Sequence, residues 1–404
     1  MLNNTLKKSA VIMLAGIALM AGKTYGQNDQ KEFPITTAVP FLLIGPDARG
    51  GSMGETGVAS DPDPASVHWN PAKYAFIDKG MGFSVSYTPW LRQLVDDIGL
   101  GYLTGYYRLD DQQVIAGSLR YFSLGEITFT DYAGNPKGTY KPNEFSLDAV
   151  YSRKLTDNFS GSVTGRFIYS NLTLGQEVQG MESHAGTSFA ADVAFFYTKE
   201  LTINRNDAWL NLGINISNIG AKISYTQTLE KDFIPTNLRL GPSLKYEIDN
   251  YNTIAFHLDF TKLLVPTMPI YARDSITGQP IYDEQGRQVI LKGHDPNVSV
   301  IKGMLQSFYD APGGFSEELK EITYAIGTEY WYNKQFAIRA GYFHESATKG
   351  ARQFFTFGAG LKYNVFGLDF SYLVSTDKRN PLDNTLRFTL NFDFEALRGG
   401  ARRK

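Results

Sequence analysis

A serine flanked by glycines is the first feature of the sequence that could perform chemistry. Residues 50–54 read Gly-Gly-Ser-Met-Gly, which matches the G-x-S-x-G pattern of the α/β-hydrolase nucleophile. That nucleophile needs a strand before it, a helix after it, and an acid and a histidine later in an α/β sheet. The flanking sequence predicts none of these elements. We therefore interpret residues 50–54 as a glycine-rich turn and predict that the protein is not an enzyme.

The titratable residues form no metal or cofactor motif. None of the five histidines has a second histidine four residues away with a glutamate between, so the zinc-peptidase pattern is missing. The sequence has no cysteine, which excludes disulfides and cysteine-ligated metals. His257 and Asp259 share one face of a predicted strand, and we interpret them as polar residues lining an interior. Asp61 and Asp63 could bind Ca²⁺, but Asp-Pro turns are the commoner reading. We expect no cofactor.

The composition limits the class of protein. A formal net charge of −2 gives no electrostatic basis for binding nucleic acid. A mean hydropathy of −0.24 is too polar for a helical membrane protein. A transmembrane barrel can be this polar, because only alternate residues of its strands meet lipid.

Strand-like alternation dominates the chain from Met81 onward. In the last segment, residues 386, 388, 390, 392 and 394 are Leu or Phe, and polar residues lie between them. Apolar faces rich in Phe and Tyr are typical of a lipid-facing wall with aromatic girdles. The sequence therefore predicts an all-β fold, a transmembrane antiparallel β-barrel of about 14 strands with an N-terminal plug, or hatch. The predicted strands span residues 81–90, 98–109, 113–131, 143–155, 159–174, 185–201, 208–220, 236–248, 253–265, 321–332, 335–345, 352–363, 366–375 and 385–394.

The predicted connections are short after even-numbered strands and mostly long after odd-numbered ones. This asymmetry is that of an outer-membrane barrel, and it argues against a soluble β-sandwich. We expect the long loops to be extracellular and both termini periplasmic. The longest loop, residues 267–320, contains apolar residues at helical spacing between Pro296 and Phe308. We predict that it binds a partner through Val298, Ile301, Met304, Leu305, Phe308 and Phe315.

The remaining regions complete a four-part organisation. Residues 1–26 are predicted to be a signal peptide, with Lys7 and Lys8 before an apolar stretch too short to span a bilayer. Residues 27–79 are the predicted hatch, residues 80–395 the barrel, and residues 396–404 a basic tail. Glu329, Arg339 and Lys362 are expected to be lumen charges that pair with one another or with the hatch.

Four segments resemble known families. Residues 53–59 (Met-Gly-Glu-Thr-Gly-Val-Ala) and 69–72 (Trp-Asn-Pro-Ala) resemble the hatch of FadL-like outer-membrane proteins. Together with residues 39–49 and 86–92 (Ser-Tyr-Thr-Pro-Trp-Leu-Arg), they resemble the PorV, or LptO, family of the type IX secretion system. The hatch motif that carries this resemblance comprises Arg49, Met53, Gly54, Gly57, Asn70 and Pro71.

The resemblance implies a function in protein export at the outer membrane of a Gram-negative bacterium. Such proteins bind the C-terminal signal domain of secreted cargo at a giant translocon barrel and pass it to a sortase-like attachment complex at the cell surface. The implied partners are these proteins and the outer-membrane lipids, and no nucleic acid. The alternative is a FadL-type transporter of hydrophobic small molecules. An older label for the family suggests lipopolysaccharide deacylation, but no nucleophile–base pair in the sequence supports that activity.

Overall fold

A computed structural model describes residues 34–395, apart from short gaps at 93–94, 96, 131–132, 176, 179–180, 227–230 and 378–379. All described residues belong to one compact unit. The predicted signal peptide, the first residues of the predicted hatch and the basic tail lie outside the described residues. Of the described helices, none is long and apolar enough to cross a membrane.

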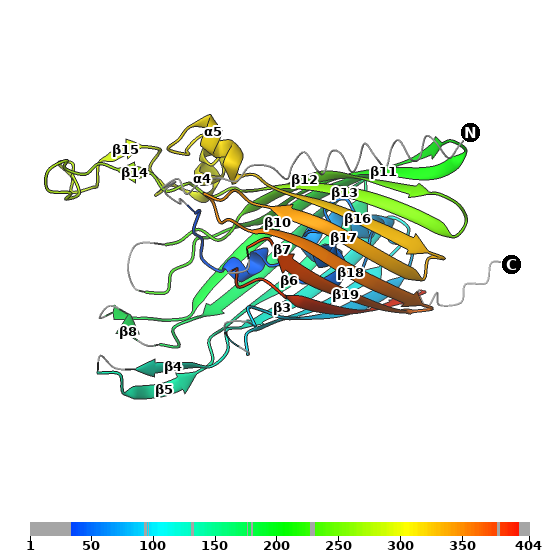
Figure 1. Ribbon diagram of the computed structural model, residues 1–404, viewed down its shortest axis with the longest axis horizontal. Helices are drawn as coiled ribbons and strands as arrows, with labels where there is room; N and C mark the ends of the chain where they lie inside the picture. The colour runs from blue at the N-terminus through cyan, green and yellow to red at the C-terminus, as the bar shows by residue number, and fades with distance from the viewer. Residues whose placement is uncertain are drawn as a thin grey trace. The chain divides into compact units, whose positions relative to one another are not determined.

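Within the described residues, fourteen antiparallel strands close into a barrel (Figure 1). Each strand pairs with the next barrel strand along the chain, and the last pairs with the first from Met81↔Phe394 to Tyr87↔Phe388. The predicted antiparallel β-barrel of about 14 strands is therefore confirmed. The strands are β1 (Met81–Pro89), β2 (Gly99–Arg108), β3 (Gln113–Ser123), β6 (Asn143–Lys154), β7 (Phe159–Asn171), β10 (Gly186–Ile203), β11 (Asn206–Gly220), β12 (Asn237–Glu247), β13 (Asn252–Leu263), β16 (Thr323–Tyr332), β17 (Phe336–His344), β18 (Gln353–Tyr363), β19 (Phe366–Ser375) and β20 (Leu386–Phe394).

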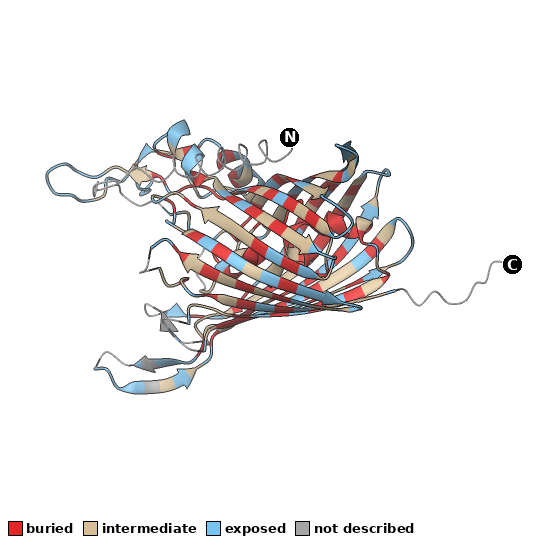
Figure 2. Ribbon diagram, turned by 45° about the vertical axis from the view of Figure 1, so that its right-hand side comes forward, coloured by how far each residue is buried: buried red, intermediate tan, exposed pale blue. Residues whose placement is uncertain are grey.

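Burial alternates along the strands in the sense expected of a membrane barrel (Figure 2). On β1 the outward side chains are apolar and exposed, with Val85 at 45% and Tyr87 at 55%. The inward side chains Ser84, Ser86 and Thr88 are polar and buried. The apolar side of a lipid-facing wall is buried against the bilayer. The hydrogen-bonding groups on its polar side must therefore find their partners within the lumen.

The connections at the two ends of the barrel differ in length, as predicted (Figure 1). Asn333 and Lys334 form a tight turn with φ of 52° and 53°, a conformation that matches the twist of a hairpin. The opposite end carries the long loops and three small hairpins. These are β4 (Ile127–Thr130) with β5 (Pro136–Tyr140), β8 (Glu177–Val178) with β9 (Met181–Glu182), and β14 (Ile270–Tyr271) with β15 (Ile290–Lys292).

Two predicted boundaries were wrong. The third barrel strand ends at Ser123 rather than Asp131, because Gly125 turns the chain with φ +78° and residues 127–140 then form a separate hairpin. The connection predicted at residues 202–207 is shorter than expected, since Asn204 and Arg205 make the turn alone with positive φ.

The N-terminal segment, residues 34–79, lies inside the barrel and consists of short helices joined by loops (blue in Figure 1). Three apolar clusters join it to the inner wall: one contains Phe41 and Phe122, one Val67 and Val114, and one Ala72 and Phe196. Its helices are η1 (Pro40–Leu43), α2 (Ala48–Ser52), α3 (Ser66–Trp69) and η2 (Pro71–Phe76).

Candidate functional site

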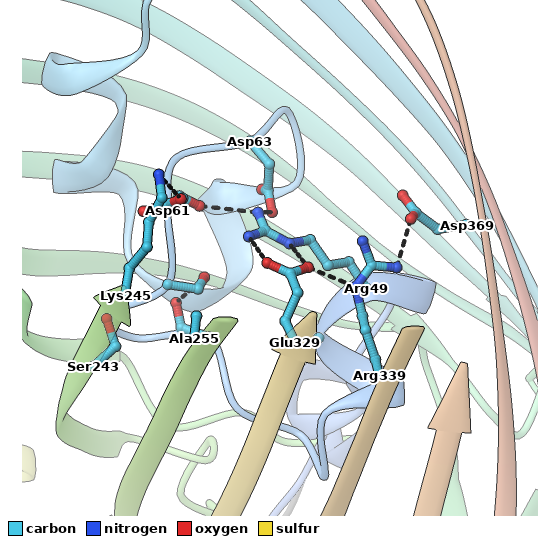
Figure 3. Close-up of polar contacts among 12 residues, drawn as sticks. Arg49, Asp61, Asp63, Ser243, Lys245, Ala255, Glu329, Arg339 and Asp369 are labelled. Carbon is cyan, nitrogen blue, oxygen red and sulfur yellow. Dashed lines mark hydrogen bonds and ion pairs between the residues drawn. The ribbon is translucent and has the colours of Figure 1, made fainter. Parts of the chain in front are cut away.

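A buried charge cluster joins the N-terminal segment to the barrel wall (Figure 3). Arg49 on α2 donates to both carboxylate oxygens of Glu329 on β16, at 3.0 and 2.9 Å. Its remaining Nη1 donates to Asp63 at 2.9 Å. A bidentate arginine–carboxylate pair fixes the direction of both side chains as well as their separation. The cluster therefore fixes the position of α2 relative to β16.

The cluster continues around the wall. Arg339 on β17 donates to Glu329 at 2.6 Å and to Asp369 on β19 at 2.7 Å. This confirms the predicted pairing of Glu329 with Arg339. The third predicted lumen charge, Lys362, lies apart from the cluster and approaches Asp393 at 3.7 Å. Buried charges are tolerated when each has a partner, because desolvation of an unpaired ion costs several kcal/mol.

Met53 and Gly54 lie in close contact with the wall. Gly54 has φ +71°, and a Cβ at this position would lie 2.7 Å from the amide nitrogen of Tyr342. Its own amide donates to Thr356 on β18 at 2.7 Å. Met53 is fully buried, and its backbone packs against Gly341 of β17. At Met53 and Gly54 the backbone of the N-terminal segment therefore approaches the backbone of β17 so closely that no side chain fits at Gly54 or Gly341.

The other hatch-motif residues connect the segment to further strands. The amides of Gly57 and Val58 donate to Asp259 on β13 at 2.8 and 3.0 Å. Asn70 donates to the Phe195 carbonyl on β10 at 3.0 Å and begins helix η2, in which Pro71 is the first residue. His257 and Asp259 are both buried, as expected of interior-lining residues. Side chains of the wall therefore satisfy backbone groups of an irregular segment, as a polar lumen requires.

The G-x-S-x-G residues belong to this packing. Ser52 is the last residue of α2, is fully buried, and donates its hydroxyl to the Arg49 carbonyl at 2.7 Å. In the described part of the chain, no group of three or more histidine, aspartate and glutamate side chains is placed to hold a metal ion.

At the long-loop end, buried ion pairs anchor part of the loop between β13 and β16. This loop contains α4 (Val300–Gln306), α5 (Phe315–Glu318) and η3 (Leu319–Glu321). Lys262 at the end of β13 binds Glu318 at 3.1 Å and Glu321 at 2.7 Å. Lys349, from the β17–β18 loop, binds Glu321 at 2.9 Å. The spacing of these residues in the sequence gives no signal of these pairs, and sequence reasoning missed them.

Two carboxylates in the anchored region have shifted pKa values. Burial raises the pKa of Asp310 to about 6, although the amide of Thr267 donates to it at 3.1 Å. Burial also acts to raise the pKa of Glu321. The hydrogen bond and charge of Lys262 outweigh that effect, and the pKa of Glu321 is lowered overall.

The predicted partner-binding residues lie on this anchored region, and four of the six are exposed. Phe315 is 76% exposed, Leu305 64%, Ile301 61% and Phe308 49%. Met304 and Val298 are half-buried. Helix α4 covers residues 300–306, so it is shorter than the predicted 296–308. We call Ile301, Leu305 and Phe308 the loop patch. Their spacing of four and three residues is that of one helix face, although Phe308 lies just after the end of α4.

Comparison with known proteins gives one family and several similar structures. The model of the family "Type IX secretion system protein PorV" matches residues 27–270. No curated protein matches the chain. The toluene transporter TodX of Pseudomonas putida has 13% identity and a TM-score of 0.49, with 89% of this chain and 98% of that chain covered. A FadL homologue of Pseudomonas aeruginosa has 11% identity and a TM-score of 0.44, with 90% and 100% covered.

Proposed function

Because the chain belongs to the PorV family of type IX secretion system proteins, we propose that it binds the C-terminal signal domain of secreted cargo at the translocon barrel. It then carries the cargo to the attachment complex at the cell surface. The protein is an outer-membrane β-barrel. In this proposal its long loops are extracellular, and the barrel holds them at the membrane surface.

The observation that carries the proposal is the loop patch on its anchored support. Exposed apolar side chains on a mobile loop would lose entropy on binding. Here buried ion pairs of Lys262 and Lys349 hold α5 and η3 in place, and Gly303 of α4 packs against Phe233 and Pro266. A pre-ordered apolar surface of this kind is typical of a protein-binding site.

The N-terminal segment supports the same function by filling the lumen. Barrels larger than this one leave an aqueous channel. In this protein the polar lumen is occupied by residues 34–79, whose Arg49, Gly57 and Asn70 bind three different strands. We propose that the segment is a hatch that closes the barrel and makes it a rigid scaffold.

The second candidate is a transporter of hydrophobic small molecules. A cavity of about 590 Å³ with Phe41 and Ile44 in its lining favours this function, since it adjoins the N-terminal segment. Transport would require the hatch to leave its place, and therefore the Arg49–Glu329 and Glu55–Arg387 pairs, which join it to the wall, to break. The two candidate functions differ in whether apolar ligands pass through the barrel. Such passage would favour the transporter.

A binding measurement with matched variants tests the cargo proposal. In the test variant Ile301, Leu305 and Phe308 are replaced by serine. In the control, Ile276, Ile281 and Leu291 are replaced by serine; these are exposed by 93%, 40% and 64% in the same long loop. Both proteins are reconstituted in nanodiscs and titrated with a purified cargo signal domain.

The patch variant is expected to bind at least roughly tenfold more weakly than wild type, because apolar contacts at the centre of an interface each contribute about 1 kcal/mol or more. The control is expected to bind like the wild type. Wild-type affinity in the patch variant would overturn the proposed role of the loop patch.

A further inference from the structure

An apolar groove crosses the lipid-facing side of the barrel wall. It begins at a cavity of about 480 Å³ whose lining includes Phe83 on β1, Gly105 on β2 and Phe394 on β20. From there it runs over β2, β3, β6, β7 and β10, which are neighbours in the barrel (Figure 1). The floor of the groove consists of a glycine or alanine from each strand at directly paired positions: Gly105, Gly117, Ala149, Gly165 and Ala191.

Large apolar side chains border the groove on both sides. Two residues toward the long-loop end, the same strands carry Leu103, Leu119, Leu147, Phe167 and Phe189. Two residues toward the short turns, they carry Tyr107, Ile115, Tyr151, Val163 and Val193. Phe189 is 70% exposed and Val163 56%, so both borders project from the wall. On the opposite wall, the outward Ala359 lies instead between Ile338 and Phe370.

The direction of the groove indicates which neighbour can occupy it. Its floor residues are paired across the strands, so the groove runs perpendicular to them. Strands of a membrane barrel are inclined by about 35–45° to the barrel axis. In two barrels packed side by side, the facing strands incline in opposite senses and cross at about 70–90°. A strand of a neighbouring barrel therefore follows the groove to within about 20°, whereas a lipid chain along the membrane normal crosses it at about 45–55°.

We propose that the groove is the contact surface for a second copy of this chain, in a two-fold symmetric dimer within the membrane. Two convex walls touch only near one crossing point, and large side chains there would hold them apart. Ala149 on β6, the central strand of the groove, lies at that point, where small residues allow two backbones to approach closely.

The same face also supplies the side chains that fill the groove. Leu147 and Tyr151 follow Ala149 on β6 at about 7 Å to either side. In the dimer, these two side chains of each copy extend along the partner's groove and cover its Gly117 and Gly165. A two-fold interface requires a surface that is complementary to itself in this way. Because lipid chains are as apolar as these residues, close packing is the interaction that stabilises the contact.

Cysteine crosslinking tests the dimer, because the chain has no cysteine of its own. The full-length variants Ala149→Cys and Ala359→Cys are reconstituted separately in vesicles of phosphatidylethanolamine and phosphatidylglycerol and oxidised with copper phenanthroline. Both positions are exposed alanines on strands of the wall. We expect at least roughly tenfold more disulfide-linked dimer from Ala149→Cys, since a disulfide forms only when the two Cα atoms come within about 7 Å.

Filling the groove provides the second measurement. Gly117→Leu and Gly165→Leu, added together to Ala149→Cys, are expected to reduce the linked dimer to the level of Ala359→Cys. Ala340→Leu, on the opposite wall, is expected to leave the dimer of Ala149→Cys unchanged. If the groove-filling variant does not fold, the comparison of Ala149→Cys with Ala359→Cys still decides the question.

Equal crosslinking at the two cysteine positions, whether high or low, would overturn the proposal. So would a chain that is monomeric in vesicles but joins a larger protein in whole outer membranes, through a photoreactive label on the Ala149→Cys variant. That result would assign the groove to a different barrel. The proposed cargo binding is tested separately, because the loop-patch variant keeps the groove and is expected to dimerise like the wild type.

Discussion

The clearest prediction about stability concerns Glu329. This carboxylate is 2% exposed and accepts hydrogen bonds from two arginines, Arg49 of the N-terminal segment and Arg339 of the wall. The substitution Glu329→Gln keeps the size of the side chain and removes its charge. Two buried guanidinium groups then face each other across a neutral amide.

The expected loss follows from the partners that remain. Removing one member of a buried ion pair costs about 3–5 kcal/mol, because the other charge stays buried and uncompensated. Arg49 keeps Asp63 and Arg339 keeps Asp369, so the lower end of that range applies. We expect Glu329→Gln to lower the free energy of unfolding by about 3 kcal/mol.

Urea-induced unfolding in phospholipid vesicles measures this loss through tryptophan fluorescence, to which the buried Trp69 of the N-terminal segment contributes. Trypsin provides a local measurement, because it cleaves after Arg49 and Lys73 only when the segment leaves the lumen. The control is Lys79→Met, which removes an exposed pair with Glu395 and is expected to cost about 0–1 kcal/mol. A Glu329→Gln protein as stable and as trypsin-resistant as the control would refute the reasoning.

Two further predictions concern a glycine and a buried carboxylate. Gly54→Ala is expected to destabilise the protein more than the matched Gly278→Ala in urea unfolding. Both residues have φ near +70°, which costs a side chain roughly 1–2 kcal/mol, but only Gly54 lies against another backbone. Equal losses would contradict the close contact. The raised pKa of Asp310, about 6, contributes stability that is fully present below its unfolded pKa of 3.8 and is lost as the pH rises through 6. Amide hydrogen exchange in residues 264–322 is therefore expected to be better protected near pH 4.5 than near pH 7, and Asp310→Asn should remove the difference; the same pH profile in Asp310→Asn would contradict the assignment.

The sequence predicts the wall well, because lipid on one side and a polar lumen on the other impose the same two-residue period on every strand. The two-residue period does not predict where a strand ends, because that depends on local backbone geometry. Gly125 is one glycine among many, yet its positive φ ends β3 eight residues before the alternation does. The turn at Asn204 and Arg205 is shorter than predicted for the same reason.

The lumen contacts divide into predictable and unpredictable pairs. Glu329 and Arg339 lie directly opposite each other on strands joined by a tight turn, so alternation and turn length are enough to predict their pairing. Lys262 and Glu321 are separated by a long loop whose path the sequence does not define. The sequence indicates only that Arg239 points inward; its stacking on the Trp69 ring, 4.7 Å away, depends on the path of the N-terminal segment.

The nature of these contacts bears on how the barrel works. A conduit must break its internal contacts in each cycle, and each buried arginine–carboxylate pair costs several kcal/mol to separate without a replacement partner. The Arg49–Glu329, Glu55–Arg387 and Asp61–Lys245 pairs join the segment to the wall, so opening the segment disrupts several pairs together. In the proposed function, cargo binds at the exposed loop patch, and the network stays intact. This energetic cost supports the proposed binding at the long-loop end over passage through the lumen.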